Sequence, residues 1–201
     1  TQDWENAKST AEKLLTQNGA LLDYSSIAEN TEGYAISEKS PELLFSQGPL
    51  NLQCDFSGSG GDFCVSNDLY KLYDENDYRR TIYFTRSTQS DSLGLNRKYQ
   101  MGKHRSYVSD IFTLRTAEGY LNAAEACAML GDAEGASGWL NQLRSKRIKD
   151  YVDVVYTADE IIEQVRAERR KELCLEGHRW FDLRRYAVCK KNPFKKVIER
   201  V

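Results

Sequence analysis

Histidine, net positive charge and long apolar runs are all scarce in this sequence. The chain of 201 residues has 2 His, and no cluster of His and Cys has the tight spacing of a zinc site. Its formal net charge of −2 provides no basic surface for nucleic acid or for an anionic membrane. No apolar stretch approaches the roughly 18 residues of a membrane span. We therefore expect one domain with no metal or other cofactor, no nucleic-acid partner and no membrane-spanning helix.

The sequence also lacks the short motifs of redox and phosphate-binding sites. None of the 5 cysteines forms a C-x-x-C pair. The Gly/Ser run at 58–61 is not followed by the Lys-Ser/Thr of a phosphate-binding loop. Cys127 and Cys174 lie in apolar helical patterns and are expected to be buried thiols. Cys54 and Cys64 bracket a Gly/Ser-rich stretch, which a disulfide would close in an oxidising compartment.

Residues 157–186 organise the rest of the chain. Thr157 is followed three residues later by Glu160, which is the spacing of a capping box at a helix start. Gly177 then predicts a turn between a long helix and a short one. The short helix interleaves aromatic side chains with charged ones, so we expect it to pack against another element.

Three carboxylates of the long helix, Glu168, Glu172 and Glu176, recur every four residues and so share one helical face. Such a group could hold a cation or supply the acid and base of a hydrolase. The neighbouring arginines and lysines provide more positive charge than these carboxylates need, however. Structural ion pairs are therefore the favoured interpretation, and we assign no catalytic residue.

Helical periodicity predicts three further helices. The first spans residues 3–17, the second 111–130 and the third about 133–147. Gly131 and Asp132 join the last two into an antiparallel hairpin of the tetratricopeptide kind. Residues 3–17 match the second helix of such a unit, which suggests that half of a hairpin is missing. The large and small positions of the repeat are filled by Tyr120, Ala124, Ala136 and Leu140.

Much of residues 20–110 is irregular by composition. Residues 81–85 are the best strand candidate, because they are β-branched and aromatic throughout. One short strand is also allowed near residues 41–45, and a helical turn begins at Asp68. The predicted fold class is mostly α, with tetratricopeptide-like helical hairpins, long irregular loops and at most a few short strands.

Three segments of the sequence together resemble a known family. They comprise LYD at 72–74 with Asp77 and Arg79, residues 114–126 with Leu140, Asn141 and Arg144, and residues 168–173 with 176–185. In this order and spacing they resemble the C-terminal half of SusD/RagB-type nutrient-binding outer-membrane lipoproteins. The third segment, ERRKEL followed by EGHRWFDLRR, is the most specific.

This resemblance implies a protein on the outer surface of Gram-negative bacteria, anchored by a lipidated cysteine that is not in this chain. Family members capture glycans without catalysis and deliver them to a partner SusC-like TonB-dependent transporter. The chain lacks an initiating methionine, the N-terminal half of the family and its usual tail. We therefore expect a single-domain fragment of a larger protein, with a helical core at about 111–187 and a loop-rich segment at about 20–110.

The charged residues of the family segments are expected to be scaffold and not ligand contacts. They alternate with apolar neighbours on helices, and a lone buried charge would cost several kcal/mol without its partner. The predicted ion-pair network contains Arg115, Glu118, Arg144, Glu168, Glu172, Glu176 and Arg179.

The loop at residues 51–66 is the predicted glycan site, because such a site needs flat aromatic faces and a few convergent polar groups. Its predicted ligand residues are Asn51, Asp55, Phe56, Asp62 and Phe63. The two Phe could equally be hydrophobic pins that hold a long loop down. Tyr83 and Tyr99 are weaker candidates, since a strand or core role explains them as well.

Two other functions stay open from the residues alone. One is a tetratricopeptide-type adaptor that binds a peptide or protein partner, although such adaptors usually show several tandem hairpins. The other is a glycoside hydrolase, which would need two carboxylates in an open cleft about 5–9 Å apart.

Overall fold

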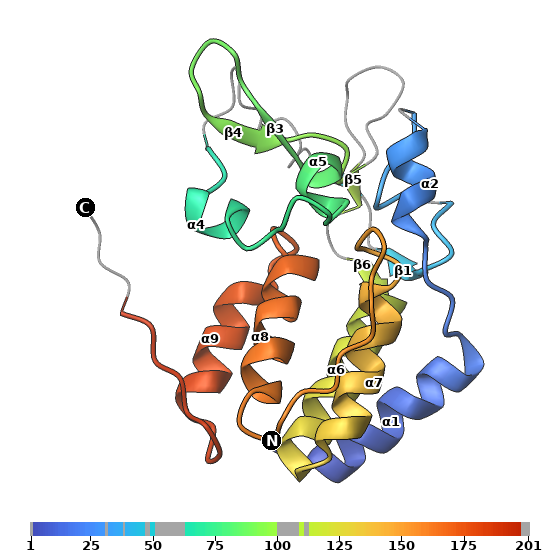
Figure 1. Cartoon of the computed structure of the whole chain (residues 1–201), viewed down its shortest axis with the longest axis vertical. Coiled ribbons are helices and arrows are strands. Elements are labelled where there is room, and N and C mark those ends of the chain that lie inside the picture. The colour runs from blue at the N-terminus through green and yellow to red at the C-terminus, as the bar shows by residue number, and fades with distance from the viewer. Residues whose placement is uncertain are drawn as a thin grey trace.

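One half of the structure consists of helices that lie side by side (Figure 1). The computed structural model describes residues 2–30, 32–37, 39–46, 49–50, 63–99, 109–110 and 113–197. The five helices are α1 (Trp4–Gln17), α6 (Thr116–Leu130), α7 (Ala133–Arg144), α8 (Ile161–Glu172) and α9 (His178–Ala187). They confirm the predicted mostly α fold. None of the described helices combines the length and apolarity needed to cross a membrane.

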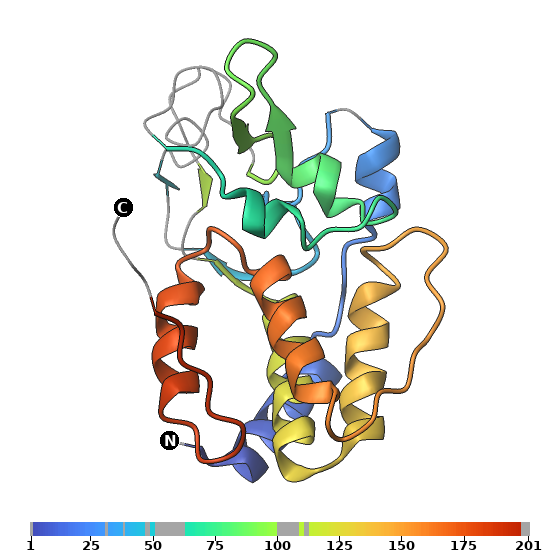
Figure 2. The ribbon, with the colours of Figure 1, turned by 60° about the vertical axis from the view of Figure 1, so that its left-hand side comes forward.

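Short helices and paired strands form the second half, which covers one end of the five helices (Figure 2). Its helices are α2 (Tyr24–Glu29), α4 (Asn67–Tyr70) and α5 (Arg79–Tyr83). Its strands form antiparallel pairs of β1 (Leu43–Ser46) with β6 (Thr113–Arg115), β2 (Pro49–Leu50) with β5 (Ser109–Asp110), and β3 (Phe84–Arg86) with β4 (Leu93–Leu95). We call this part the irregular half.

The hairpin of α6 and α7 forms as predicted. Gly131 ends α6 with a φ of 89°, a conformation that glycine adopts without strain. The side chain of Asp132 then caps α7 by accepting a hydrogen bond from the Gly135 backbone N–H at 2.8 Å. The ring of Tyr120 meets Trp139 edge to face across the hairpin, with centroids 5.7 Å apart. The expected repeat residues Tyr120, Ala124, Ala136 and Leu140 are all buried in one apolar cluster.

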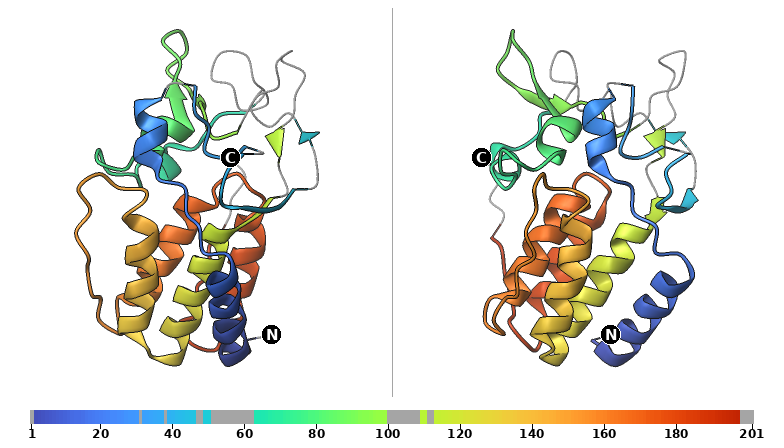
Figure 3. Two further views of the ribbon diagram at one scale, coloured as in Figure 1. Left: turned by 90° about the vertical axis from the view of Figure 1, so that its right-hand side faces the viewer. Right: turned by 45° about the vertical axis from the view of Figure 1, so that its right-hand side comes forward.

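Helix α1 packs against α6 (Figure 3). The close approach depends on Gly119, because a Cβ there would lie 3.2 Å from Leu15 Cδ2. Beyond α1, the chain is tied to α6 through its backbone, as the Tyr120 hydroxyl donates a hydrogen bond to Gly19 O at 2.8 Å. These contacts position the start of the irregular half relative to the helices.

The strand predicted at residues 81–85 is wrong over most of its length. Helix α5 occupies 79–83, and β3 begins only at Phe84. Arg79, Ile82 and Tyr83 are all buried. A helical turn brings such i, i+3 and i+4 side chains to one face, whereas a strand would turn the adjacent Ile82 and Tyr83 to opposite faces. Tertiary burial therefore overrides β propensity here.

Two predicted helix starts also differ from the structure. The helix expected from residue 111 begins at Thr116, because Leu114 belongs to β6 and pairs with Phe45 of β1. Helix α8 begins at Ile161, after a turn. The Thr157 N–H and hydroxyl both donate to the Glu160 carboxylate, but Thr157 is not the N-cap.

A second apolar cluster fills the irregular half and is rich in tyrosine. Tyr24 and Tyr83 are fully buried and their hydroxyls lie 3.0 Å apart. Tyr73 also belongs to this cluster, together with Cys174 from the helical half. Cys127 is buried in the first cluster, so both predicted buried thiols are confirmed.

Candidate functional site

The carboxylates of Glu168, Glu172 and Glu176 lie where the two halves meet. Glu168 and Glu172 belong to α8, and Glu176 precedes α9. The cations that contact them come from both halves and are Arg79, Lys98, Arg115, Arg144, Arg147 and Lys171. We refer to these residues, together with Glu42 and Asp77, as the ion-pair network.

Glu172 is the centre of the ion-pair network. Its carboxylate accepts hydrogen bonds from Arg79 Nη1 at 2.8 Å, Arg115 Nη1 at 2.6 Å and Arg147 Nη2 at 3.0 Å. Glu42 supplies a second carboxylate, which lies 3.2 Å from Arg115 and 2.6 Å from Arg147. Such multiple charge-assisted bonds offset the cost of removing the charges from water.

The carboxylates on either side of Glu172 are paired in the same way. Glu168 accepts from Arg79 Nη1 at 2.6 Å and from Arg144 Nε at 2.7 Å. Glu176 accepts from Lys98 Nζ at 2.9 Å. Because Arg79 and Lys98 come from the irregular half, these bonds fasten that half onto the end of α8.

The pKa values of these carboxyls follow from this arrangement. Burial alone would raise the pKa of Glu172, but the surrounding arginines outweigh burial and hold it well below the usual 4.5. At Glu176, Arg115 and Lys98 likewise overcome burial and lower the pKa to about 2. Both groups are therefore ionised and enclosed by cations at neutral pH, so neither can donate a proton as a general acid.

The structure brings Arg115, Arg144, Glu168, Glu172 and Glu176 together, as the sequence predicts. Two other predicted members lie elsewhere. Glu118 is part of a separate cluster, 3.2 Å from Arg169, which also pairs with Asp182 at 3.0 Å. The prediction that Arg179 belongs to the network is wrong. In the described part of the chain Arg179 forms no ion pair, and its side chain lines a cavity instead.

Sequence reasoning missed three of the cations that reach the network from outside α8, which are Arg79, Lys98 and Arg147. Arg79 had a signal, because it and Asp77 lie in one of the family segments, and the two side chains pair at 2.8 Å. Neither Lys98 nor Arg147 had such a signal in the sequence. Lys98 lies in polar sequence without a period, and Arg147 follows the last turn of α7. Only the fold shows that Lys98 pairs with Glu176 and Arg147 with Glu172.

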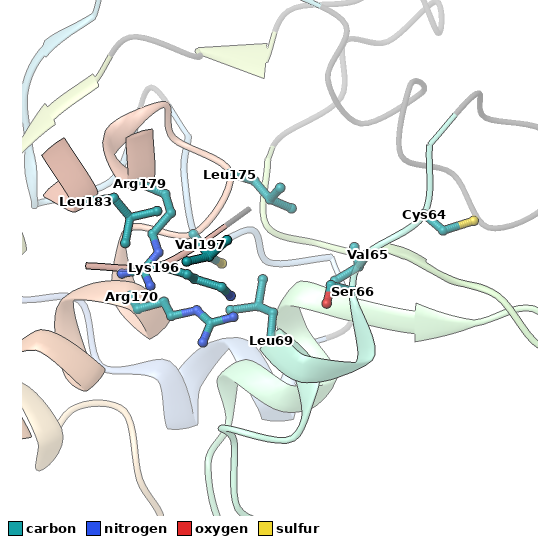
Figure 4. Close-up of a pocket in the computed structure, with 11 residues that line it drawn as sticks. Cys64, Val65, Ser66, Leu69, Arg170, Leu175, Arg179, Leu183, Lys196 and Val197 are labelled. Atoms are coloured by element: carbon teal, nitrogen blue, oxygen red, sulfur yellow. The ribbon is translucent and has the colours of Figure 1, made fainter. Parts of the chain in front are cut away.

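A cavity of about 590 Å³ opens near this network (Figure 4). It is bounded by the segment that leads into α4, by α8 and α9, and by the chain that follows α9. Its apolar wall consists of Val65, Leu69, Leu175, Leu183 and Val197, and its cationic side chains are Arg170, Arg179 and Lys196. Figure 4 shows these three cations close together, with Cys64 at the opposite end. We call this space the main cavity.

The cations of the main cavity are poorly compensated. Among the described residues that line it, none is a carboxylate. Burial, and then the neighbouring charge of Arg170, lower the pKa of Arg179. An apolar wall with a few convergent hydrogen-bond donors is the usual composition of a small-molecule site.

The predicted ligand residues lie in different environments. Phe63 is exposed over 59% of its surface, and the next residue, Cys64, lines the main cavity. Tyr83 and Tyr99 are fully buried, and the Tyr99 hydroxyl donates to Leu175 O at 2.8 Å. These two rings have no face open to a sugar and belong to the core. The predictions for Asn51, Asp55, Phe56 and Asp62 fall outside the described residues, as does Cys54, while Cys64 is a free thiol.

Comparison with solved structures shows the same fold in several bacterial proteins. A SusD-like carbohydrate binding protein from Bacteroides vulgatus ATCC 8482 superposes with a TM-score of 0.72 and 25% identity, over 90% of this chain and 41% of that one. A SusD homolog from Bacteroides thetaiotaomicron VPI-5482 has a TM-score of 0.71 and 23% identity, over 96% and 48% of the two chains. Surface glycan-binding protein A from Bacteroides uniformis has a TM-score of 0.64 and 22% identity, over 93% and 48%.

The chain spans less than half the length of these three structures. No curated protein sequence matches it. The sequence model of the SusD family matches residues 94–200, which include the whole of α6 to α9. Since this match covers more than half of the chain, the protein belongs to the SusD family.

Proposed function

We propose that this chain is part of a non-catalytic protein that captures glycans at the cell surface and delivers them to a SusC-like TonB-dependent transporter. In this proposal the protein is held at the outer membrane by a lipid anchor, and the 201 residues form one domain of a longer chain. The observation that carries the proposal is membership of the SusD family, with structural relatives described as carbohydrate-binding and glycan-binding.

In this proposal the glycan site comprises the main cavity and the predicted ligand residues of the segment 51–66. The loop at residues 51–66 ends at the cavity, since Cys64, Val65 and Ser66 all line it. The exposed ring of Phe63 lies at this end and can stack on the apolar face of a sugar ring. The guanidinium groups of Arg170 and Arg179 can donate hydrogen bonds to sugar oxygens.

Replacing both Phe56 and Phe63 with alanine is expected to weaken glycan binding about tenfold, which corresponds to about 1.4 kcal/mol. The reason is the loss of two predicted stacking faces, of which Phe63 is exposed over 59% of its surface. Isothermal titration calorimetry with the polysaccharide that binds best in a glycan array would measure the effect, and circular dichroism would show that the fold is retained.

The matched control for this pair is Phe45→Ala with Phe181→Ala. Both of these rings are exposed, by 55% and 67%, and neither lines the main cavity. Their double variant should bind the glycan as the parent protein does. Equal affinity of all three proteins would remove Phe56 and Phe63 from the site.

A turnover assay separates capture from hydrolysis. We expect polysaccharide to be bound and recovered intact, because the carboxylates best spaced for acid–base work, Glu168 and Glu172, have no exposed side-chain surface and are held by arginines. Release of reducing ends by the purified protein would overturn this part of the proposal. Binding to a peptide array with no binding to glycans would favour the adaptor function instead.

A further inference from the structure

Among the described residues, Arg166 stands apart from the other buried arginines because no carboxylate pairs with it. It is 7% exposed, and its Nη1 donates a hydrogen bond to the backbone oxygen of Asn192 at 2.9 Å, the one hydrogen bond its side chain makes within the described residues. Its Nε and Nη2 are buried without any hydrogen-bond partner. By contrast, the fully buried Arg79 and Arg147 each meet at least two carboxylates.

A buried guanidinium edge without acceptors destabilises the fold, because its N–H groups have lost their hydrogen bonds to water and have formed none within the protein. Nε and Nη2 lie on the same edge of the guanidinium, which is the edge that binds a carboxylate or sulfate through two parallel hydrogen bonds. The flat face of the Arg166 guanidinium, by contrast, stacks on the ring of Tyr186, whose centroid lies 4.4 Å from Cζ. Within the described residues, no carboxylate pairs with Arg166.

Arg166 lines a small cavity of about 150 Å³ that shares two arginines with the main cavity. Arg170 and Arg179 line both spaces, so the two adjoin at these side chains. The small cavity is several times the roughly 30 Å³ that one water occupies, which leaves room for an oxyanion group. Its described lining contains one carboxylate, Glu163, which forms no ion pair in the described part of the chain.

The distribution of charge therefore favours a negatively charged ligand. The two cavities together present four cations, Arg166, Arg170, Arg179 and Lys196, against the single carboxylate of Glu163. A neutral sugar would leave this excess uncompensated. A sugar with an acidic group would place its ring against the apolar wall of the main cavity and its anion among the arginines.

We propose that Arg166, Arg170 and Arg179 form a binding site for an oxyanion carried by the glycan, a carboxylate of a uronic acid or a sulfate ester. This proposal rests on the proposed function and adds to it the class of ligand. Arg170 and Arg179 meet the anion where the two cavities join, and Arg166 closes the site from the small cavity. Lys196 adds positive charge at the entrance.

The test compares acidic oligosaccharides with neutral forms of the same sugars. The probes are trigalacturonate and its methyl ester, and a sulfated chondroitin tetrasaccharide and its desulfated form, each titrated calorimetrically into the purified protein at 150 mM salt. The variant is Arg170→Gln with Arg179→Gln, since Arg166 is buried and its replacement could disturb the fold. We expect at least one acidic probe to bind, and the variant to lose tenfold or more of that affinity.

The matched control is Arg184→Gln with Lys195→Gln. It removes the same net charge from α9 and the chain that follows it, but neither residue lines either cavity, and both are exposed. We expect less than a twofold change in affinity for this control, because exposed charges are largely screened at this salt concentration.

Each possible outcome decides a separate point. Equal binding of acidic and neutral probes, unaffected by the Arg170/Arg179 variant, would overturn the oxyanion site and leave glycan capture standing. Binding of no probe here and of no polysaccharide in the glycan array would overturn the proposed function itself. Arginine-dependent binding of inorganic sulfate or of poly-glutamate without binding of either acidic sugar would also overturn the proposal, in favour of a free anion or an acidic protein segment.

Discussion

Replacing Glu172 with alanine is expected to lower the free energy of unfolding by about 3–5 kcal/mol, the cost of removing one side of a buried ion pair. Arg79, Arg115 and Arg147 all donate to this carboxylate, and all three are buried. A domain has a net stability of about 5–15 kcal/mol, so the loss is a large share of the total. We expect a much lower urea midpoint by far-UV circular dichroism, or no cooperative folding.

The control lies on the same helix. Glu163 of α8 is exposed and has no ion pair in the described part of the chain, so Glu163→Ala should change stability by about 0–1 kcal/mol. Glu172→Gln keeps the shape and some hydrogen bonds but not the charge, and it should fall between the two. If Glu172→Ala and Glu163→Ala had the same urea midpoint, the network would not hold the two halves together.

The ion-pair network was only partly predictable, for a physical reason. Glu168 and Glu172 could be grouped because helical spacing places them on one face of α8, whereas Glu176, expected on the same helix, lies in the turn that follows it. Their partners are distant in sequence, as Arg79 lies 89 and 93 residues from Glu168 and Glu172. No local pattern links such positions. Periodicity shows which side chains share a face, but not which segment will cover that face.

The helical core was easier to predict than the irregular half. Tyr120, Ala124, Ala136 and Leu140 belong to adjacent helices joined by a two-residue turn, so local signals determine their packing. Residues 81–85 carry the β propensity that predicted a strand, yet 81–83 belong to helix α5, whose Arg79 is buried against Glu168 of α8. In that part of the chain, contacts with other segments decide the secondary structure.

In the candidate site, too, some features could be predicted from the sequence and others could not. The sequence predicted a glycan site at residues 51–66, because glycine and aromatic content are visible without a fold, and the last residues of that segment, Cys64, Val65 and Ser66, line the main cavity. Arg166 has no distinguishing signal in the sequence, and Arg170 is one of several arginines expected to pair with the carboxylates of this helix. Their difference from Arg79 and Arg147 is the absence of carboxylate partners within the described residues, and that appears only in three dimensions.

Acid is expected to destabilise the protein through the same network, and the pH range follows from the pKa shifts. Glu176 has a folded-state pKa of about 2 against an ordinary value of 4.5. A depressed pKa means that the folded state favours the ionised form, so this contribution is complete above about pH 4.5 and disappears as the pH falls towards 2. At 1.36 kcal/mol per pKa unit, the contribution of Glu176 is about 3 kcal/mol at neutral pH. Glu168 and Glu172 are lowered in the same direction and add to the loss.

The contribution of Glu176 can be separated from that of every other acid by comparison with Glu176→Gln. Urea unfolding of both proteins at pH 7, 5.5, 4.5, 3.5 and 2.5 gives the difference in unfolding free energy at each pH. Groups common to both proteins cancel, so the difference should be constant from pH 7 to about 5 and then shrink below pH 4.5. The reason is that protonation of Glu176 in the parent protein removes the charge that the variant already lacks. A difference that stayed constant down to pH 2.5 would mean that Lys98 and Arg115 do not hold this carboxylate in its ionised form.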